Sequence, residues 1–475
     1  MSKLNAILGM GKRSLQTSQM GLQTVSHNIA NKSTEGYSRQ RVEQTSTPPT
    51  GQGRVQIGTG ATVAAVRSIK NEYLEKQIQG ETEKLGFQES RSENMTRVEQ
   101  VFNEQLNKGL NQFIGDFFNS FRELANAPES AASRTLVKET AKSLVNDFRR
   151  VNNQLIDVQI DIDHQIENEV SLINSMAKEI ASLNEKISQV EIQGRNANDE
   201  RDRRDLLLKQ LGEKVDIKYA ENELGQVSVM AGSNATIVSG FSHAEIFAQP
   251  SNKFEGHRHG TVKVMFKASE TTSPVDITKQ LSGGRIGAAL EVRDEYIEGL
   301  LDQLDDVAFT LNREVNSQHI NGKDRRGQNG VLFFDLLQSK SNAAANLKLN
   351  DSVENDVNRI VAGQSSNGPG DNRIANSIAS IQNKKVLNDG TASMDDFYTA
   401  IVGKVAVTVN KANMSSEHQK GIVDQLANIR ESISGVSLDE ETTKMIELQK
   451  SFDASARLIR TADEMFDTVL NIKRY

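Results

Sequence analysis

The feature that most constrains this chain is that its first and last segments carry the same kind of apolar stripe. Apolar and small residues recur at alternating steps of four and three near both termini, which predicts one face of a long helix at each end. The amino-terminal positions are Leu4, Leu8, Gly11, Leu15, Ser18, Leu22, Val25 and Ile29. The carboxyl-terminal positions are Leu438, Met445, Leu448, Phe452, Ala456, Ile459, Ala462, Phe466 and Leu470. Two such helices cover each other only if the chain ends meet, so we expect a terminal hairpin with every other domain inserted into it.

A pair of helices cannot cover both stripes completely, so we expect apolar surface to remain for neighbouring subunits. Burial of each Leu-sized side chain there would contribute about 1.5–3 kcal/mol. The alternative is that both stripes pack inside one bundle of the same chain. The predicted assembly interface comprises Leu4, Leu8, Leu15, Leu22, Val25, Ile29, Leu438, Met445, Phe452, Ile459, Phe466 and Leu470.

The middle of the chain is predicted to be mainly helical, because only six prolines occur in 475 residues and proline interrupts helix interiors. A long stripe there favours a core helix of a bundle, with a free-standing two-chain coiled coil as the alternative. Its positions are Leu144, Phe148, Val151, Leu155, Val158, Ile162, Leu172, Met176, Leu183, Ile187 and Val190.

Residues 215–277 change to short runs typical of strands, such as QVSVM and TVKVMF, and helix returns from Gly283. So small a β unit is expected to lean on the helical part and to act as an outer spacer. The predicted fold class is mainly α with an inserted small β unit, in an elongated multi-domain subunit whose terminal helices pair as a coiled-coil-like hairpin. The expected domains are 1–65 plus 432–475 (terminal helical, tube-inner), 66–214 plus 278–431 (helical rod) and 215–277 (β unit).

Composition argues against several classes of partner. The formal net charge is −7, which does not suit a chain built to neutralise phosphates, so we expect no nucleic acid. No stretch approaches 18 apolar residues, and the amino terminus lacks the apolar run of a cleavable signal peptide, so no membrane span is expected. Cysteine is absent, which removes disulfides and cysteine-based metal sites.

Catalytic motifs are also absent, since the chain contains no G-x-S-x-G, no H-E-x-x-H and no P-loop. His257 and His259 could share a strand face as metal ligands, but an exposed polar pair explains them better. Asp199, Asp202 and Asp205 alternate with arginines and are expected to form solvated ion pairs along one helix. We therefore predict no enzyme activity, no cofactor and no metal.

Two terminal motifs resemble the flagellar rod, hook and hook-associated protein family. They are GLQTVSHNIANKSTEGYSRQRV at 21–42 and SGVSLDEETTKMIELQKSFDASARLIRTADEMFDTVLNI at 434–472. In the first, Asn28 and Asn31 suit left-handed backbone and helix capping, and Gly36 suits a turn that presents Tyr37. We add Asn28, Asn31, Gly36 and Tyr37 to the predicted interface.

Two internal segments resemble the hook-associated members of that family in particular. One is ANDERDRRDLLL at 197–208, and the other is the run Asn316, His319, Gly322, Asp324, Gly327, Gly330 and Phe334. Longer members carry an extra outer domain, whereas only about 16 residues lie between Gly330 and Leu347 here. That outer domain is therefore expected to be missing.

The resemblance implies a structural subunit of the bacterial flagellum that joins hook to filament and forms a homo-oligomer. It implies the flagellar hook protein and the second hook-filament junction protein as neighbours, and an export chaperone on residues 434–475. It also implies an extracellular location, reached through the flagellar type III export channel without a cleavable signal peptide. The alternatives are a coiled-coil surface adhesin or interaction protein whose β unit binds a host ligand and, more remotely, an enzyme with a site in the β unit.

Overall fold

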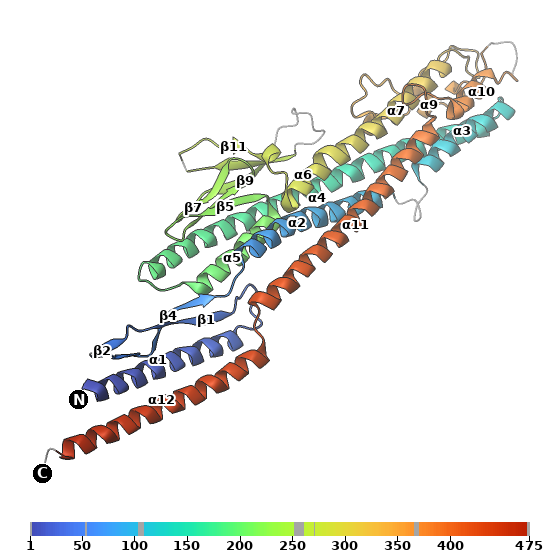
Figure 1. Ribbon diagram of the computed structural model, residues 1–475. Helices are drawn as coiled ribbons and strands as arrows, with labels where there is room; N and C mark the ends of the chain where they lie inside the picture. The colour runs from blue at the N-terminus through green and yellow to red at the C-terminus, as the bar shows by residue number, and fades with distance from the viewer. Residues whose placement is uncertain are drawn as a thin grey trace.

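The computed structural model describes residues 2–52, 55–102, 109–250, 261–269, 271–364 and 370–472. The protein is an elongated, mainly helical rod with a narrower helical hairpin at one end, where both termini lie (Figure 1). The predicted fold class is confirmed, including the pairing of the two terminal helices. None of the helices in the described ranges is long and apolar enough to span a membrane.

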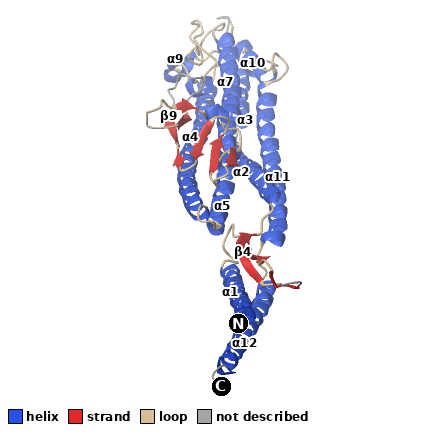
Figure 2. Cartoon of the chain, turned by 60° about the vertical axis from the view of Figure 1, so that its left-hand side comes forward, coloured by secondary structure: helices blue, strands red, loops and turns tan. Residues whose placement is uncertain are grey.

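The terminal unit consists of two antiparallel helices and a set of strands next to the first of them (Figure 2). The helices are α1 (Ser2–Ala30) and α12 (Leu438–Ile472), and the strands are β1 (Gln40–Ser46), β2 (Thr50–Gln52), β3 (Val55–Ile57) and β4 (Ala61–Ser68). β1 pairs antiparallel with β4, and β2 pairs with β3. These strands are not predicted from the sequence, because polar Gln, Thr and Arg side chains interrupt their apolar alternation.

The rod is a bundle of long helices joined by short ones. Its helices are α2 (Glu72–Val101), α3 (Leu110–Asn126), α4 (Ala131–Glu191), α5 (Asn198–Lys214), α6 (Gly284–Glu291), α7 (Glu298–His319), α8 (Ala343–Asn346), α9 (Asp351–Asn355), α10 (Arg373–Ser380) and α11 (Met394–Ser434). A π-helical turn, Val292–Ile297, joins α6 to α7, and 3-10 turns lie at Thr278–Gln280, Val357–Arg359 and Ile381–Asn383.

The stripe of α4 packs into the rod core, which favours the bundle interpretation over a two-chain coil. The predicted stripe positions from Leu144 to Ile162 are buried, but Leu172 is half exposed. Beyond Ile162, the buried face of α4 continues with Ile166, Val170 and Ile173. From Ile162 to Ile173 the stripe therefore covers eleven residues in three turns. This period is close to that of a straight α-helix, whereas a strict repeat of seven would require a supercoil. Farther along, Leu183 and Ile187 are buried, and Met176 and Val190 are half-buried.

The β unit lies against α4 and shares the rod's core. One sheet has the order β5-β6-β7-β8 and the other β11-β10-β9. Asn174 of α4 bonds both backbone groups of Ile246, and Asn184 bonds both backbone groups of Val227. The strands are β5 (Ile217–Glu221), β6 (Val227–Ala231), β7 (Ala235–Ser239), β8 (Ser242–His243), β9 (Glu245–Pro250), β10 (Val262–Lys267) and β11 (Val275–Asp276).

The run that begins at Asn316 closes the far end of the rod. The Asn316 side-chain carbonyl accepts the backbone N–H groups of Phe333 and Phe334, which carry buried rings at the end of the core. His319 is fully buried; its Nδ1 donates to the Val331 carbonyl at 2.6 Å, and its Nε2 accepts the Val361 N–H at 3.0 Å. Because a backbone N–H can only donate, this arrangement requires neutral His319.

We predict that this histidine makes the rod acid-sensitive. Burial, together with Arg134 and Arg359 nearby, lowers the pKa of His319 to about 4, against about 6.5 in an unfolded chain. The unfolded state therefore takes up the proton first, and the stabilisation present above pH 6.5 is lost as the pH falls toward 4. The expected loss is about 3 kcal/mol in urea unfolding between pH 7 and pH 4. The His319→Asn variant should lose this part of the pH dependence, and His164→Gln, at an exposed site on α4, should retain it.

Candidate assembly interface

The contact between α1 and α12 is made by small residues. Ser14 Oγ lies 2.7 Å from Ser455 Oγ, and Ser18 Oγ donates to Ser451 Oγ at 3.1 Å. A side-chain carbon on Gly11 would lie 2.7 Å from Ile459 Cγ1, and one on Gly21 would lie 2.8 Å from Leu448 Cδ2. Steps of three and four between these four α1 positions put them on one face, so the helices approach closely along a line of Gly and Ser.

The predicted leucines of α1 lie beside this line rather than on it. Val25 is buried, whereas the other predicted apolar positions of α1 are half-buried. On α12, Leu438 is exposed, Leu470 belongs to the helix but its side chain lies outside the described residues, and the other predicted positions are half-buried. The half-buried positions are Leu4, Leu8, Leu15, Leu22, Ile29, Met445, Phe452, Ile459 and Phe466. Sequence reasoning missed Ser14, Gly21, Ser451 and Ser455, although their small size at helical spacing is a usable signal.

Asn28 is the polar centre of the hairpin. It is buried inside α1, where its Nδ2 donates to the Gln40 carbonyl at 3.0 Å and to Glu441 Oε2 at 2.9 Å. Its Oδ1 accepts the Gln40 N–H at 3.0 Å and the Tyr37 hydroxyl at 2.7 Å. One amide thereby joins α1, the start of β1 and the first turn of α12.

The rest of the Asn-x-x-Asn motif ends α1 and reverses the chain. Asn31 Nδ2 donates to the His27 carbonyl at 3.0 Å, which caps the helix as predicted, and Gly36 lies in the predicted turn with a positive φ of 79°. Neither asparagine adopts left-handed backbone, and Tyr37 is buried against Asn28 rather than presented outward. Burial, followed by the charges of Asp199, Asp202 and Glu441, raises the pKa of Tyr37, so the phenol stays a hydrogen-bond donor.

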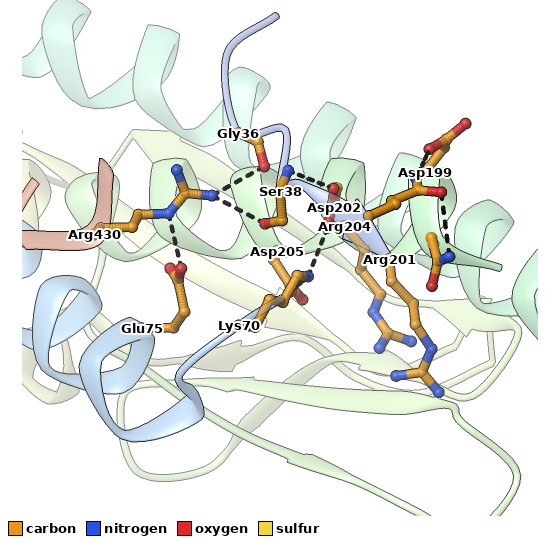
Figure 3. A network of polar contacts seen from close by, with 12 residues as sticks. Gly36, Ser38, Lys70, Glu75, Asp199, Arg201, Asp202, Arg204, Asp205 and Arg430 are labelled. Atoms are coloured by element: carbon orange, nitrogen blue, oxygen red, sulfur yellow. Dashed lines mark hydrogen bonds and ion pairs between the residues drawn. The ribbon is translucent and has the colours of Figure 1, made fainter. Parts of the chain in front are cut away.

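A polar cluster centred on α5 lies where the hairpin meets the rod (Figure 3). Asp202 Oδ2 accepts the Ser38 N–H at 2.8 Å. Lys70 Nζ lies 2.7 Å from Asp202 Oδ1 and 2.6 Å from Asp205 Oδ2. Burial alone would lower the pKa of Lys70, but Asp205 and Asp202 outweigh it and raise that pKa, so the ammonium keeps its charge.

A neighbouring set of contacts comes from α11. Arg430 Nε lies 2.7 Å from Glu75 Oε1, and its Nη2 donates to the Gly36 carbonyl at 3.1 Å and to Ser38 Oγ at 3.3 Å. The chain reversal after α1 is therefore bonded to both α5 and α11. We call the set Ser38, Lys70, Glu75, Asp202, Asp205 and Arg430 the α5 clamp.

The prediction that Asp199, Asp202 and Asp205 form solvated ion pairs with arginines of their own helix is wrong. Asp202 and Asp205 pair with Lys70, and Asp199 contacts His27 at 3.2 Å and Gln40 at 2.7 Å. The arginines pair with carboxylates of other segments. Arg201 pairs with Glu191 and Glu221, Arg203 with Glu179, and the buried Arg204 with Glu221. Carboxylates and guanidinium groups on one helix face different neighbours, because tertiary partners approach from opposite sides.

Nothing in the described part of the chain gathers three or more potential metal-binding side chains. His257 and His259 lie outside the described residues. The candidate functional features are the hairpin surface and the clamp that connects it to the rod. A long helical rod that ends in a hairpin of paired termini, with apolar side chains left half-covered, defines a structural assembly protein.

Comparison with known proteins identifies the family. Residues 95–334, just over half of the chain, match the family described as "Flagellar hook-associated protein FlgK helical domain", and residues 431–472 match "Flagellar basal body rod FlgEFG protein C-terminal". The chain belongs to the FlgK family of flagellar hook-associated proteins. It is accordingly a structural flagellar protein.

Full-length relatives agree with this assignment. The chain is 28% identical to "Flagellar hook-associated protein 1" of Bacillus subtilis, with 98% of this chain and 97% of the relative covered. It is 24% identical to the protein of the same name from Salmonella typhimurium, with 99% and 100% covered. The solved structure of the flagellar hook junction protein FlgK from Burkholderia pseudomallei has the same fold, with a TM-score of 0.68 at 13% identity over 75% of this chain and 100% of that one.

Proposed function

We propose that this chain joins the flagellar hook to the filament by packing its α1–α12 hairpin against copies of itself. The names of the relatives support the place in the flagellum. The observation that carries the packing role is the row of half-covered apolar side chains beside the α1–α12 contact. A subunit that worked alone would gain stability by covering them.

These side chains gather on one side of the hairpin. Leu15 and Leu22 lie three residues before and four residues after Ser18, and Phe452 and Ile459 stand in the same relation to Ser455. In an antiparallel pair of right-handed helices, equal offsets from the contact line lead to the same side. The hairpin thus offers one continuous apolar strip, which suits side-by-side packing in a tube.

The finer assignments rest on the family. We propose the three domain boundaries predicted above, a hook protein on one side and a second junction protein on the other, and export through the flagellar channel. An export chaperone on residues 434–475 would cover the exposed Ile446, Leu458 and Met465 of α12. We also propose that the chain performs no catalysis. The adhesin alternative is not favoured by the relatives.

Removal of residues 1–42 and 436–475 tests whether the hairpin is required for flagellar assembly but not for folding of the rod. The rod should keep its cooperative thermal transition, because its main core extends from Met95 to Val409 and includes no residue of the removed segments. Cells that make only the truncated chain should assemble hooks without filaments, as seen by electron microscopy. Normal filaments on such cells would disprove the role of the hairpin, and retained host-cell binding would favour an adhesin.

A further inference from the structure

The outer face of α11 combines exposed apolar side chains with charge of one sign. Val407 and Met414 are 70% and 66% exposed. The exposed Lys404 and Lys411 alternate with them at steps of three and four, so the four side chains share one face of the helix. Residues 397–416 contain no Asp or Glu. We call these four residues the α11 face.

The outer face of α4 carries the opposite charge. Asp157, Ile160, Asp161 and Glu167 are all exposed, although Ile160 is apolar. Spacings of three, four and seven place them along one side of the helix. Residues 151–177 contain no Lys or Arg. We call these four residues the α4 face.

Most charges of the two faces have no counterion within the subunit. Lys404, Lys411, Asp157 and Asp161 form no ion pair with another described residue. An exposed helix commonly mixes both signs of charge, which gives it ion pairs between successive turns. Each face therefore offers its charge to a partner outside the subunit.

The two faces lie at the same level on opposite edges of the rod. The helix α2 contacts both α4 and α11 and lies between them (Figure 2). Both α4 and α11 run from the far end of the rod toward the hairpin (Figure 1). Gln165, within the span of the α4 face, donates from Nε2 to Ser90 Oγ of α2 at 3.4 Å, and Asn413, within the span of the α11 face, accepts from Ser92 Oγ. Two copies that stand side by side would therefore bring the faces together.

A hollow lies next to the α11 face. It is a cavity of about 230 Å³ between α2, α7 and α11, lined by apolar Met95, Leu300 and Val405 and also by Lys404 and Glu295. Helices pack by placing the side chains of one into the grooves of the other. The α11 edge of the rod thus offers room for an apolar side chain in addition to its two positive charges.

We infer that the α11 face of one copy packs against the α4 face of the next copy, so that Lys404 and Lys411 meet Asp157 and Asp161. The inference rests on the proposed function, in which copies of this chain pack side by side in a tube. The partner is a second copy because one chain carries both complementary faces, on opposite edges and at one level. Such a head-to-tail contact repeats from copy to copy and can close a ring. It involves the rod alone and adds a lateral interface to that of the hairpins.

Thiol cross-linking in assembled flagella tests the inference, because the chain has no cysteine. Ile160→Cys and Asn410→Cys place one exposed thiol on each side and leave the charges of both faces unchanged. Cells that carry the double variant in place of the parent chain are treated with a short bis-maleimide. A blot against this chain should show a ladder of dimers, trimers and larger products. Each single variant should give at most about a tenth of that product, because a head-to-tail contact does not bring two copies of one face together.

Charge reversal tests the pairing of the two faces. Lys411→Glu in the double-cysteine chain should lower the yield of cross-linked product about threefold, because carboxylates would then face each other. Asp161→Lys should lower it by a similar factor, and the two reversals together should restore it. Lys385→Glu, at an exposed site before α11, is the matched control and should leave the yield unchanged.

Three results would overturn the inference. Filaments on the double-cysteine cells show that the chain has been incorporated, so a missing ladder on such cells would disprove the contact and leave the proposed function standing. Strong dimer formation by either single variant would indicate a symmetric contact instead. A ladder that neither charge reversal weakens would rule out the pairing of the lysines with the aspartates. Failure of the proposed function would appear in the truncation experiment, as normal filaments.

Discussion

Cells that carry Leu22→Asp or Phe452→Asp in place of the parent chain are expected to make hooks without filaments and to lose swimming. Both side chains belong to the apolar strip of the hairpin and are half-covered in the subunit. A carboxylate there would meet an apolar neighbour without compensation, at a cost of at least about 2 kcal/mol for each contact. Each 1.4 kcal/mol weakens an association about tenfold, and the cost recurs at every subunit contact.

The purified variants should keep the thermal transition of the rod, because the strip lies outside its core. Gln16→Asp is the matched control, since Gln16 is exposed on α1 and its helical position is opposite the contact line. That variant should assemble normally. Normal filaments with Leu22→Asp would contradict the packing role, and loss of the rod transition would place the strip in the subunit's own core.

Replacement of residues 215–277 by a short Gly/Ser linker is expected to unfold the rod. The spacer hypothesis from the sequence predicts that this replacement costs stability rather than function, but the strands share the rod core through fully buried Val229, Ile237, Ile246 and Val264. Each such side chain contributes about 1.5–3 kcal/mol, against a net stability of about 5–15 kcal/mol for a typical domain. Asn174 and Asn184 of α4 would also lose backbone partners.

Circular dichroism melting of the purified chains measures this effect. The replaced chain should show no cooperative transition at 25 °C or above. Phe241→Ser, at an exposed tip between β7 and β8, should melt like the parent chain. If the replaced chain still melts cooperatively near the melting temperature of the parent chain, the result would support the hypothesis that the β unit is only an outer spacer.

Much of the fold was predictable because it depends on local periodicity. The long helices follow from steps of three and four in the apolar residues and from the rarity of proline, and the β unit follows from its short strand-like runs. The meeting of the chain ends follows from two stripes that each need a partner. Four motifs in the same order along the chain indicate the family.

The sequence alone therefore determined the helical class, the terminal hairpin and the family, since periodicity and motif spacing are properties of neighbouring residues. Tertiary structure decided which residues face each other. On α1, Ser14 and Gly21 rather than the leucines contact α12, and Asp202 pairs with Lys70 rather than with arginines of its own helix. The physical reason is that helical spacing defines which residues share a face, whereas close approach and charge pairing depend on which distant segment arrives at that face.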